Sequence, residues 1–143
     1  MDAQRWFELA NVLALPGWAA LVFLAPVRRA AAVRVARVVG ASLALGYLVG
    51  FVAAISSAKG FAADYSLAGI SASFADPRLA LVAWVHYLAF DLWVGAWEVE
   101  AAGRAGMRHA FVVPALLLTF LLGPIGLLTF LALRALTARG VHR

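Results

Sequence analysis

The chain has 143 residues, 65% of them hydrophobic and 13% charged, and its mean hydropathy of +0.92 excludes an ordinary soluble domain, which carries about 25% charged residues. The absence of cysteine excludes thiol chemistry and disulfide bonds, and three histidines are too few for the multi-histidine di-iron sites of membrane desaturases. The net charge is +5, but the arginines flank apolar stretches and do not alternate with aromatic residues, a pattern typical of contact with a lipid bilayer and not of nucleic-acid binding.

Residues 6–24 form the first apolar stretch, which ends shortly before Arg28 and Arg29. Crossing a bilayer core of about 30 Å takes a helix of about 20 residues, so this stretch predicts a membrane span. A cleaved signal peptide is the competing interpretation, but it needs basic residues before the apolar stretch, and here they follow it. Asn11 lies inside the span, and we expect it to bond to another helix.

The second span is predicted over residues 38–55, where small side chains recur at every fourth position. Such a ridge lets another backbone approach closely, so we expect this helix to pack inside the bundle. Residues 56–78 are the longest polar segment and show no clean helical period, which predicts an interfacial loop with one short helix. The ridge consists of Ser42, Gly46, Gly50 and Ala54.

The third span is predicted over residues 79–99, because Asp76 and Pro77 before it are typical of a helix N-terminus. It holds His86 and Asp91 near its centre. Ionisable groups at that depth cost about 2.5–3.5 kcal/mol each on insertion scales, so they are candidates for function. At 100° per residue the two side chains point about 140° apart, and each needs a partner from another helix.

The fourth span is predicted over residues 111–133, with Gly123 and Pro124 in its middle. Proline removes one hydrogen bond, so we expect a single membrane helix with a kink. The predicted fold is therefore an all-α bundle of four transmembrane helices in one domain, residues 1–143. Lys and Arg divide equally between its two ends, so the positive-inside rule does not fix the orientation.

The residues that can carry chemistry admit several interpretations. His86 and Asp91 are catalytic groups or structural groups that hold helices in register, and His86 alone is a weak signal for a metal or porphyrin, so we predict no metal and no cofactor. Aromatic and polar side chains at similar depth are candidate substrate contacts, although tryptophan and tyrosine also form interfacial belts. These candidates are Asn11, Trp18, Tyr47, Trp84, Phe90, Trp93, Trp97 and Thr119. Glu98 and Glu100 are interpreted as part of a solvated helix end.

Three groups of residues stand out when taken together. They are Asn11 with Leu15-Pro16-Gly17-Trp18 and Pro26; Trp84-Val85-His86-Tyr87-Leu88-Ala89-Phe90-Asp91-Leu92 with Gly95 and Trp97; and Pro114, Leu118-Thr119-Phe120 and Gly123-Pro124-Ile125-Gly126-Leu127-Leu128. This combination resembles the abscisic acid-deficient-four-like family of small four-helix membrane proteins. The second span and the loop after it match less well.

The plant members of that family are required to make neoxanthin from violaxanthin, an isomerisation that opens a carotenoid 5,6-epoxide to an allenic alcohol. The resemblance therefore implies a carotenoid or a similar isoprenoid as ligand. Such an isomerase needs an acid and a base but no cofactor, and the hypothesis assigns these roles to Asp91 and His86 in either order.

Two other functions stay open at this point. One is an accessory membrane subunit that binds a pigment or lipid without turnover, and the other is a small transporter or scaffold. The composition, rich in alanine and arginine, indicates a multi-pass protein of a bacterial inner membrane, so the plant substrate is not carried over unchanged. A homo-oligomer or a larger membrane complex is compatible with the sequence.

Overall fold

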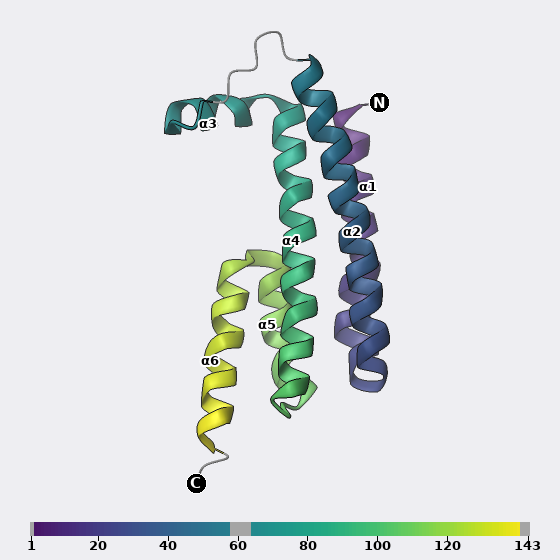
Figure 1. The fold of residues 1–143 in the computed structure, drawn as a ribbon, viewed down its shortest axis with the longest axis vertical. Helices are drawn as coiled ribbons and strands as arrows, with labels where there is room; N and C mark the ends of the chain where they lie inside the picture. Colours follow the sequence, from purple (N-terminus) through teal and green to yellow (C-terminus); the bar gives the residue numbers. More distant parts are fainter. Residues whose placement is uncertain (1, 58–63, 141–143) are drawn as a thin grey trace.

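The computed structural model describes residues 2–57 and 64–140, and all of its regular structure in these ranges is helical, which confirms the all-α prediction. Three long rods lie side by side along the longest axis, and a pair of shorter helices covers one end of them (Figure 1). The elements are α1 (Ala3–Ala19), the π-helix η1 (Ala20–Leu24), α2 (Ala25–Ser57), α3 (Leu67–Ala75), α4 (Pro77–Arg104), α5 (His109–Leu122) and α6 (Pro124–Gly140).

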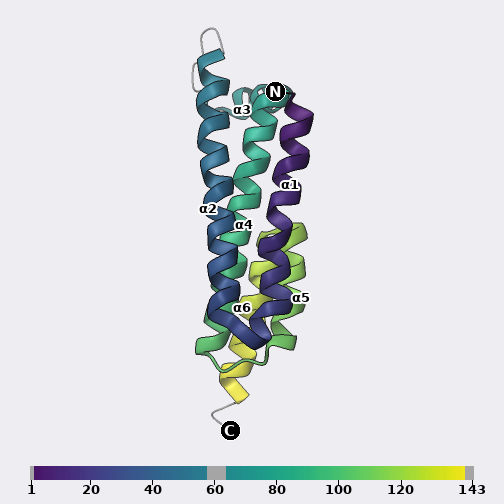
Figure 2. The same ribbon diagram turned by 90° about the vertical axis from the view of Figure 1, so that its right-hand side faces the viewer.

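The first two rods meet at a reversal centred on Arg28. Its φ of −137° and ψ of 66° are not helical, so α2 consists of a short part that continues η1 and a long part that returns alongside α1. The long part begins well before residue 38, where the second span was expected, because the segment with Arg34 and Arg37 is rich in alanine and arginine, both strong helix formers. The two rods are close together at the reversal and diverge toward the N-terminus (Figure 2).

The central rod is α4, which contacts every other helix. Asp76 caps its N-terminus by accepting a hydrogen bond from the Arg78 backbone N–H (2.8 Å), as the sequence predicts. A close approach to α1 occurs at Gly95, where a Cβ atom would lie only 2.8 Å from the ring of Trp18. Trp18 is 6% exposed, so this tryptophan is a core packing residue.

The fourth apolar stretch is two helices, and the prediction of a single kinked helix is wrong. The chain turns at Gly123, whose φ of +40° is unfavourable for other residues, and Pro124 then starts α6 at its first helical position. With 14 residues, α5 is about 21 Å long, which is too short to cross a bilayer core of about 30 Å. After the turn α6 runs back toward the end where α5 begins (Figures 1 and 2). We call this pair the α5–α6 hairpin.

The segment between the second and third rods contains one short helix, α3, as predicted. The Ser66 hydroxyl accepts a hydrogen bond from the Gly69 backbone N–H (3.1 Å) and so caps this helix. It projects sideways from the N-terminal end of α4, away from α1 and α2 (Figure 1), and exposes Leu67 and Phe74. Lys59 lies outside the described residues.

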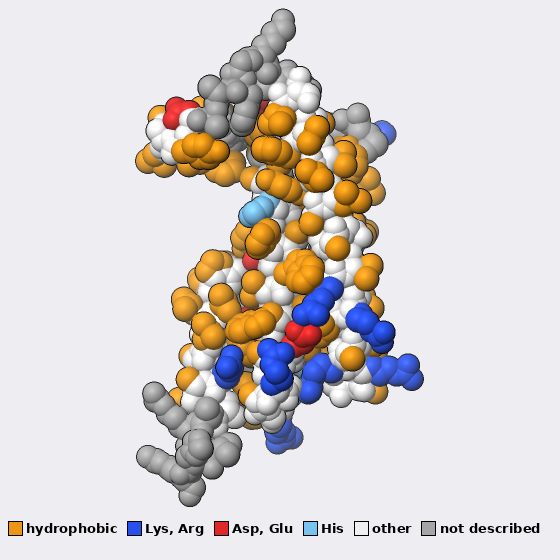
Figure 3. Space-filling model, viewed as in Figure 1, with side chains coloured by type: hydrophobic (Ala, Val, Ile, Leu, Met, Phe, Trp, Pro, Cys, Tyr) orange, Lys and Arg blue, Asp and Glu red, His pale blue; other side chains and the backbone are white. Residues whose placement is uncertain are grey.

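Two helical stretches, Ala3–Ser56 and Pro77–Arg104, are long and apolar enough to cross a membrane. The first of them includes the reversal at Arg28 and therefore consists of two rods. Orange apolar side chains cover most of the face seen in Figure 3, whereas the basic side chains gather toward the end with the α5–α6 hairpin. This distribution is typical of a helical protein in a bilayer, with a charged rim at one side.

Candidate functional site

A stripe along α4 carries two carboxyl groups toward the α5–α6 hairpin. Asp91 and Glu98 are seven residues apart, which corresponds to two helical turns and about 10.5 Å along the axis. Gly95 lies between them on the same face. The hairpin packs against this stripe from Asp91, which faces Gly123, to Glu98, which bonds to Thr119.

Glu98 is the more deeply buried of the two acids. It has no exposed surface, and its Oε1 accepts a hydrogen bond from the hydroxyl of Thr119 in α5 (2.9 Å). Its Oε2 is also buried and has no hydrogen-bond partner among the described residues. The interpretation of Glu98 as part of a solvated helix end is therefore wrong, because the hairpin folds back over it. Glu100 faces another side and forms an ion pair with Arg37 (2.7 Å).

Asp91 lies beside the turn of the hairpin. A Cβ atom on Gly123 would be 2.9 Å from Oδ1 of Asp91 and 3.2 Å from the hydroxyl of Tyr87, so both side chains converge on the turn. Tyr87 precedes Asp91 by one helical turn, and the two side chains interact. Oδ2 of Asp91 is buried without a hydrogen-bond partner among the described residues. The phenol of Tyr87, which can donate a proton, and the carboxyl group of Asp91, which can accept one, thus lie next to each other at the hairpin turn.

The surface next to this pair is hollowed. Figure 3 shows a recess between α3 and the turn of the α5–α6 hairpin, where no helix covers α4. An aromatic row leads to it from α1, with ring centroids 5.6 Å apart between Phe7 and Trp84 and 5.8 Å apart between Trp84 and Tyr87. The Trp84 indole N–H donates a hydrogen bond to Asn11 (3.2 Å), so Asn11 bonds across helices as expected. The aromatic row therefore ends at Tyr87, one helical turn before Asp91.

His86 lies on a different face of α4 from Asp91, as the helical period predicts. It is exposed, and its ring stacks on Phe90 (4.5 Å between centroids) and contacts Tyr47 of α2 (5.5 Å). The structure therefore does not bring His86 and Asp91 together. Trp93 continues the His86 face and lies under the guanidinium of Arg37, 5.6 Å from the ring centroid.

The remaining predicted contact residues lie beside the hairpin or in the core. Trp97 packs edge-on against Phe130 of α6, with 5.4 Å between the ring centroids. Trp18 packs against Phe120 of α5 (5.3 Å), and Thr119 is the hydrogen-bond partner of Glu98. These three residues hold the α5–α6 hairpin against the long rods and do not line the recess.

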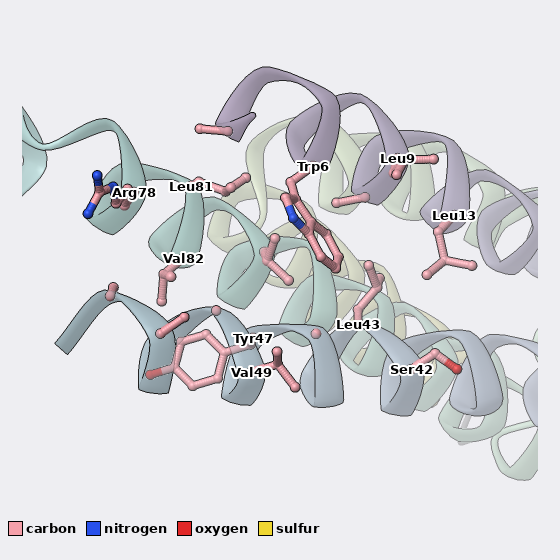
Figure 4. Close-up of a pocket in the computed structure, with 17 residues that line it drawn as sticks. Trp6, Leu9, Leu13, Ser42, Leu43, Tyr47, Val49, Arg78, Leu81 and Val82 are labelled. Carbon is pink, nitrogen blue, oxygen red and sulfur yellow. The ribbon is translucent and has the colours of Figure 1, made fainter. Parts of the chain in front are cut away.

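A separate apolar groove of about 560 Å³ opens where α1 and α2 diverge, with α4 as its floor. Figure 4 shows Trp6 of α1 and Leu43 of α2 pointing toward one another across it. The small-residue ridge of the second rod lines this groove, and a Cβ atom on Gly46 would meet nothing within 4 Å. The expectation that the ridge packs tightly inside the bundle is therefore wrong at Gly46, because α1 diverges from α2 at this level.

Comparison with known proteins identifies the family. A family model described as ABA DEFICIENT 4-like matches residues 5–130, which include the three rods, the aromatic row, Asp91, Glu98 and the hairpin turn. The chain belongs to the ABA DEFICIENT 4-like family. This membership confirms the resemblance seen in the sequence and implies a role in processes related to carotenoids and neoxanthin.

No curated protein and no solved structure matches this ABA DEFICIENT 4-like chain. Its site residues are therefore assigned from its own geometry. Across residues 2–57 and 64–140, no group of three or more His, Cys, Asp and Glu side chains is placed to hold a metal ion. His142 lies outside these ranges.

Two residues of the acid site were not among the predicted site residues. Tyr87 and Glu98 lie four residues before and seven residues after Asp91, so the helical period alone places all three on neighbouring parts of one face. That signal is present in the sequence. What the sequence does not reveal is that the hairpin turns at Gly123 and buries this face.

Proposed function

We propose that this ABA DEFICIENT 4-like protein is a multi-pass protein of a bacterial inner membrane that isomerises a carotenoid epoxide, or a related isoprenoid epoxide, to an allenic product. The observation that carries the proposal is the convergence of Tyr87 and Asp91 on the hairpin turn at the edge of the recess. Ionisable groups buried at membrane depth are costly and usually functional. A phenol beside a carboxyl group supplies both groups that this acid–base reaction needs.

The reaction moves one proton and changes no oxidation state. The Tyr87 hydroxyl donates its proton to the epoxide oxygen while the C–O bond breaks at the carbon next to the polyene. The Asp91 carboxylate removes the proton from the adjacent vinylic carbon, and that C–H bonding pair becomes the second double bond of the allene. The proton then returns from Asp91 to the Tyr87 phenolate. Substrate and product are isomers, so the step needs no cofactor.

The recess suits the shape of such a substrate. A polyene is long, flat and apolar, and flat conjugated groups pack well against aromatic rings. Phe7 and Trp84 present exposed ring surface, and their row ends at Tyr87. A polyene that lies along this row brings its epoxide end group to Asp91.

His86 is the alternative candidate for a catalytic group that pairs with Asp91. His86 and Asp91 point to different faces, so one epoxide cannot contact both side chains in this arrangement. The pairing of Tyr87 with Asp91 predicts that His86→Ala retains turnover and Tyr87→Phe loses it. The pairing of His86 with Asp91 predicts the reverse.

A second candidate function is binding of an isoprenoid or lipid chain without turnover. The groove between α1 and α2 favours it, because about 560 Å³ of largely apolar space is lined by Leu9, Leu13 and Val85 and lies away from Asp91. In that case the protein is an accessory membrane subunit. A co-purifying isoprenoid that is recovered unchanged is the expected finding.

The decisive experiment incubates the purified protein in mild detergent with violaxanthin and separates the products by chromatography with mass spectrometry. We expect a product of unchanged mass with an allenic spectrum. Asp91→Asn is expected to lower the rate by about 100-fold or more, which is the usual contribution of a general acid or base. Glu8→Gln is the matched control, because it removes an acid that is exposed on α1. Unchanged violaxanthin with wild-type protein contradicts the isomerase and favours the binding subunit.

A further inference from the structure

We infer that Glu98 is a neutral, protonated carboxylic acid inside the hairpin interface, and that it thereby leaves the negative charge of the acid pair on Asp91. The inference deepens the proposed function, on which it rests for the role of Asp91 as a base. What it adds is which of the two acids carries the proton. That location can be measured without turnover.

The burial of Glu98 is the first reason. The side chain has no exposed surface, and its one hydrogen bond comes from the Thr119 hydroxyl to Oε1. Its Oε2 has no partner among the described residues. An ionised carboxylate with an unpaired buried oxygen is far less stable than a neutral carboxylic acid in the same place, because the charge has lost its water.

The charges that face Glu98 are the second reason. On α4 the titratable group that interacts with Glu98 is Asp91, whereas Glu100 faces another side and forms an ion pair with Arg37. From α5 the contact is the uncharged Thr119. The packed part of α1 presents Trp18, and α6 presents Phe130 to the same half of α4. Within the described part of the chain, no ion pair joins a cation to Glu98.

The two acids also influence each other. Asp91 and Glu98 interact electrostatically along the face of α4. Asp91 is two helical turns away, so its charge destabilises a carboxylate at Glu98 less than burial does, but in the same direction.

The geometry decides which acid retains a proton. Asp91 is only half-buried, lies at the edge of the recess and has the Tyr87 hydroxyl as a donor next to it. A nearby hydroxyl donor stabilises a carboxylate. Glu98 has a hydroxyl donor as well, Thr119, and each acid has one buried oxygen without a partner among the described residues, so the difference between them is the complete burial of Glu98. The proton therefore resides on Glu98, and Asp91 is free to act as the carboxylate base.

Glu98 is thus a positioning residue, which acts through Asp91 and through the α5–α6 hairpin and does not touch the substrate. The best replacement for a neutral glutamic acid is glutamine, which has the same shape, no charge and an oxygen that accepts the Thr119 hydrogen bond. We expect Glu98→Gln to change the turnover rate by about threefold or less. Asp91→Asn, by contrast, abolishes the base.

Infrared spectroscopy of the purified protein at neutral pH tests the inference directly, since a protonated carboxyl group has a C=O band separate from those of carboxylates and amides. We expect this band in the wild-type protein, its retention in Asp91→Asn and in the Glu8→Gln control, and its loss in Glu98→Gln. Loss of the band in Asp91→Asn with retention in Glu98→Gln overturns the inference, as does absence of the band from the wild type. Partial loss in both variants also overturns it, because both acids then carry protons.

A chemical readout on the wild-type chain guards against misfolding of the variants. Dicyclohexylcarbodiimide reacts with protonated carboxyl groups in apolar surroundings, and peptide mass spectrometry locates the adduct. We expect the adduct on Glu98 and not on Asp91, and an adduct on Asp91 alone contradicts the inference. A wild-type protein that shows the Glu98 band but converts no epoxide contradicts the proposed function and leaves the location of the proton intact.

Discussion

Gly126 of α6 lies directly against the backbone and hydroxyl of Thr119 in α5, and this contact closes the α5–α6 hairpin. The Thr119 hydroxyl in turn donates to Glu98, so the tight turn and the buried acid belong to one packed unit. A side chain larger than hydrogen at position 126 has no room. The geometry of the acid site therefore depends on a glycine that takes no part in chemistry.

Replacing Gly126 by alanine is expected to destabilise the protein by about 1–3 kcal/mol, since the added methyl group meets fixed backbone atoms and forces the hairpin apart. Gly46→Ala is the matched control, because its Cβ meets nothing within 4 Å and alanine favours a helix by about 1 kcal/mol over glycine. Unfolding in mixed detergent, followed by circular dichroism, measures both. Equal stability of the two variants would show that the hairpin is not closed at Gly126.

Two glycines with positive φ allow the effect of backbone strain in a turn to be distinguished from the effect of contact with the acid site. Gly123 has φ +40° and faces Asp91, whereas Gly106 has φ +65° and nothing within 4 Å of its Cβ position. Alanine at either position is expected to cost about 1–2 kcal/mol of backbone strain. Only Gly123→Ala is expected to lower epoxide turnover as well, by about tenfold or more, because its methyl group displaces Asp91 and Tyr87. Comparable turnover in both variants contradicts a site at the hairpin turn.

The sequence predicts α4 well because both of its signals are local. Asp76 and Pro77 mark its start, and the helical period separates the face of His86 from that of Asp91, as the ring contacts show. That Asn11 bonds to another helix follows from the cost of an amide inside an apolar helix, and the structure identifies Trp84 as its partner. These features need no knowledge of how the helices are arranged.

The hairpin could not be predicted in the same way, because its apolar pattern is equally typical of one helix that crosses the membrane. Pro124 within a span indicates a kink, and only the positive φ of Gly123 together with the contact between Gly126 and Thr119 converts the kink into a reversal. The burial of Glu98 depends on that reversal. From sequence alone, an acid near a helix end is interpreted as solvated, because a helix that folds over it cannot be recognised.

The hairpin also bears on the membrane orientation, which the sequence alone does not fix. It returns Arg134 to the end of the bundle that carries Arg104, and the two arginines line one small pocket. The described basic residues then lie mostly at this end, where a single crossing would have divided them equally. The positive-inside rule therefore predicts that this end faces the cytoplasm and that the N-terminus of α1 lies on the other side.

Single cysteines test this orientation cleanly, because the natural chain contains none. We expect Ala105→Cys, between α4 and α5, and Thr137→Cys, near the end of α6, to react with a membrane-impermeant maleimide only after the cells are opened. Tyr65→Cys, on the opposite end beside α3, is expected to react in intact cells. Labelling of Thr137→Cys and Ala105→Cys from opposite sides rules out the re-entrant hairpin.

Two tryptophans on opposite faces of α4 distinguish the aromatic row from the face of His86. Trp84 and Trp93 are similarly exposed, at 39% and 44%, but Trp84 belongs to the aromatic row that ends at Tyr87, whereas Trp93 lies under Arg37. Loss of an aromatic contact costs about 0.5–1.5 kcal/mol beyond the buried area, so Trp84→Ala is expected to weaken epoxy-carotenoid binding by about tenfold. Trp93→Ala is expected to change it by about twofold or less.

Binding is measured by the shift of the carotenoid absorption spectrum on titration with each purified variant. Trp84→Ala also removes the hydrogen bond to Asn11, so Asn11→Ala serves as a second control that removes the bond and keeps the ring. If the aromatic row binds the polyene, Asn11→Ala stays close to the wild type while Trp84→Ala does not. A loss confined to Trp93→Ala instead places the polyene on the face where His86 stacks on Phe90, and contradicts the assignment of Tyr87 and Asp91 as the reacting pair.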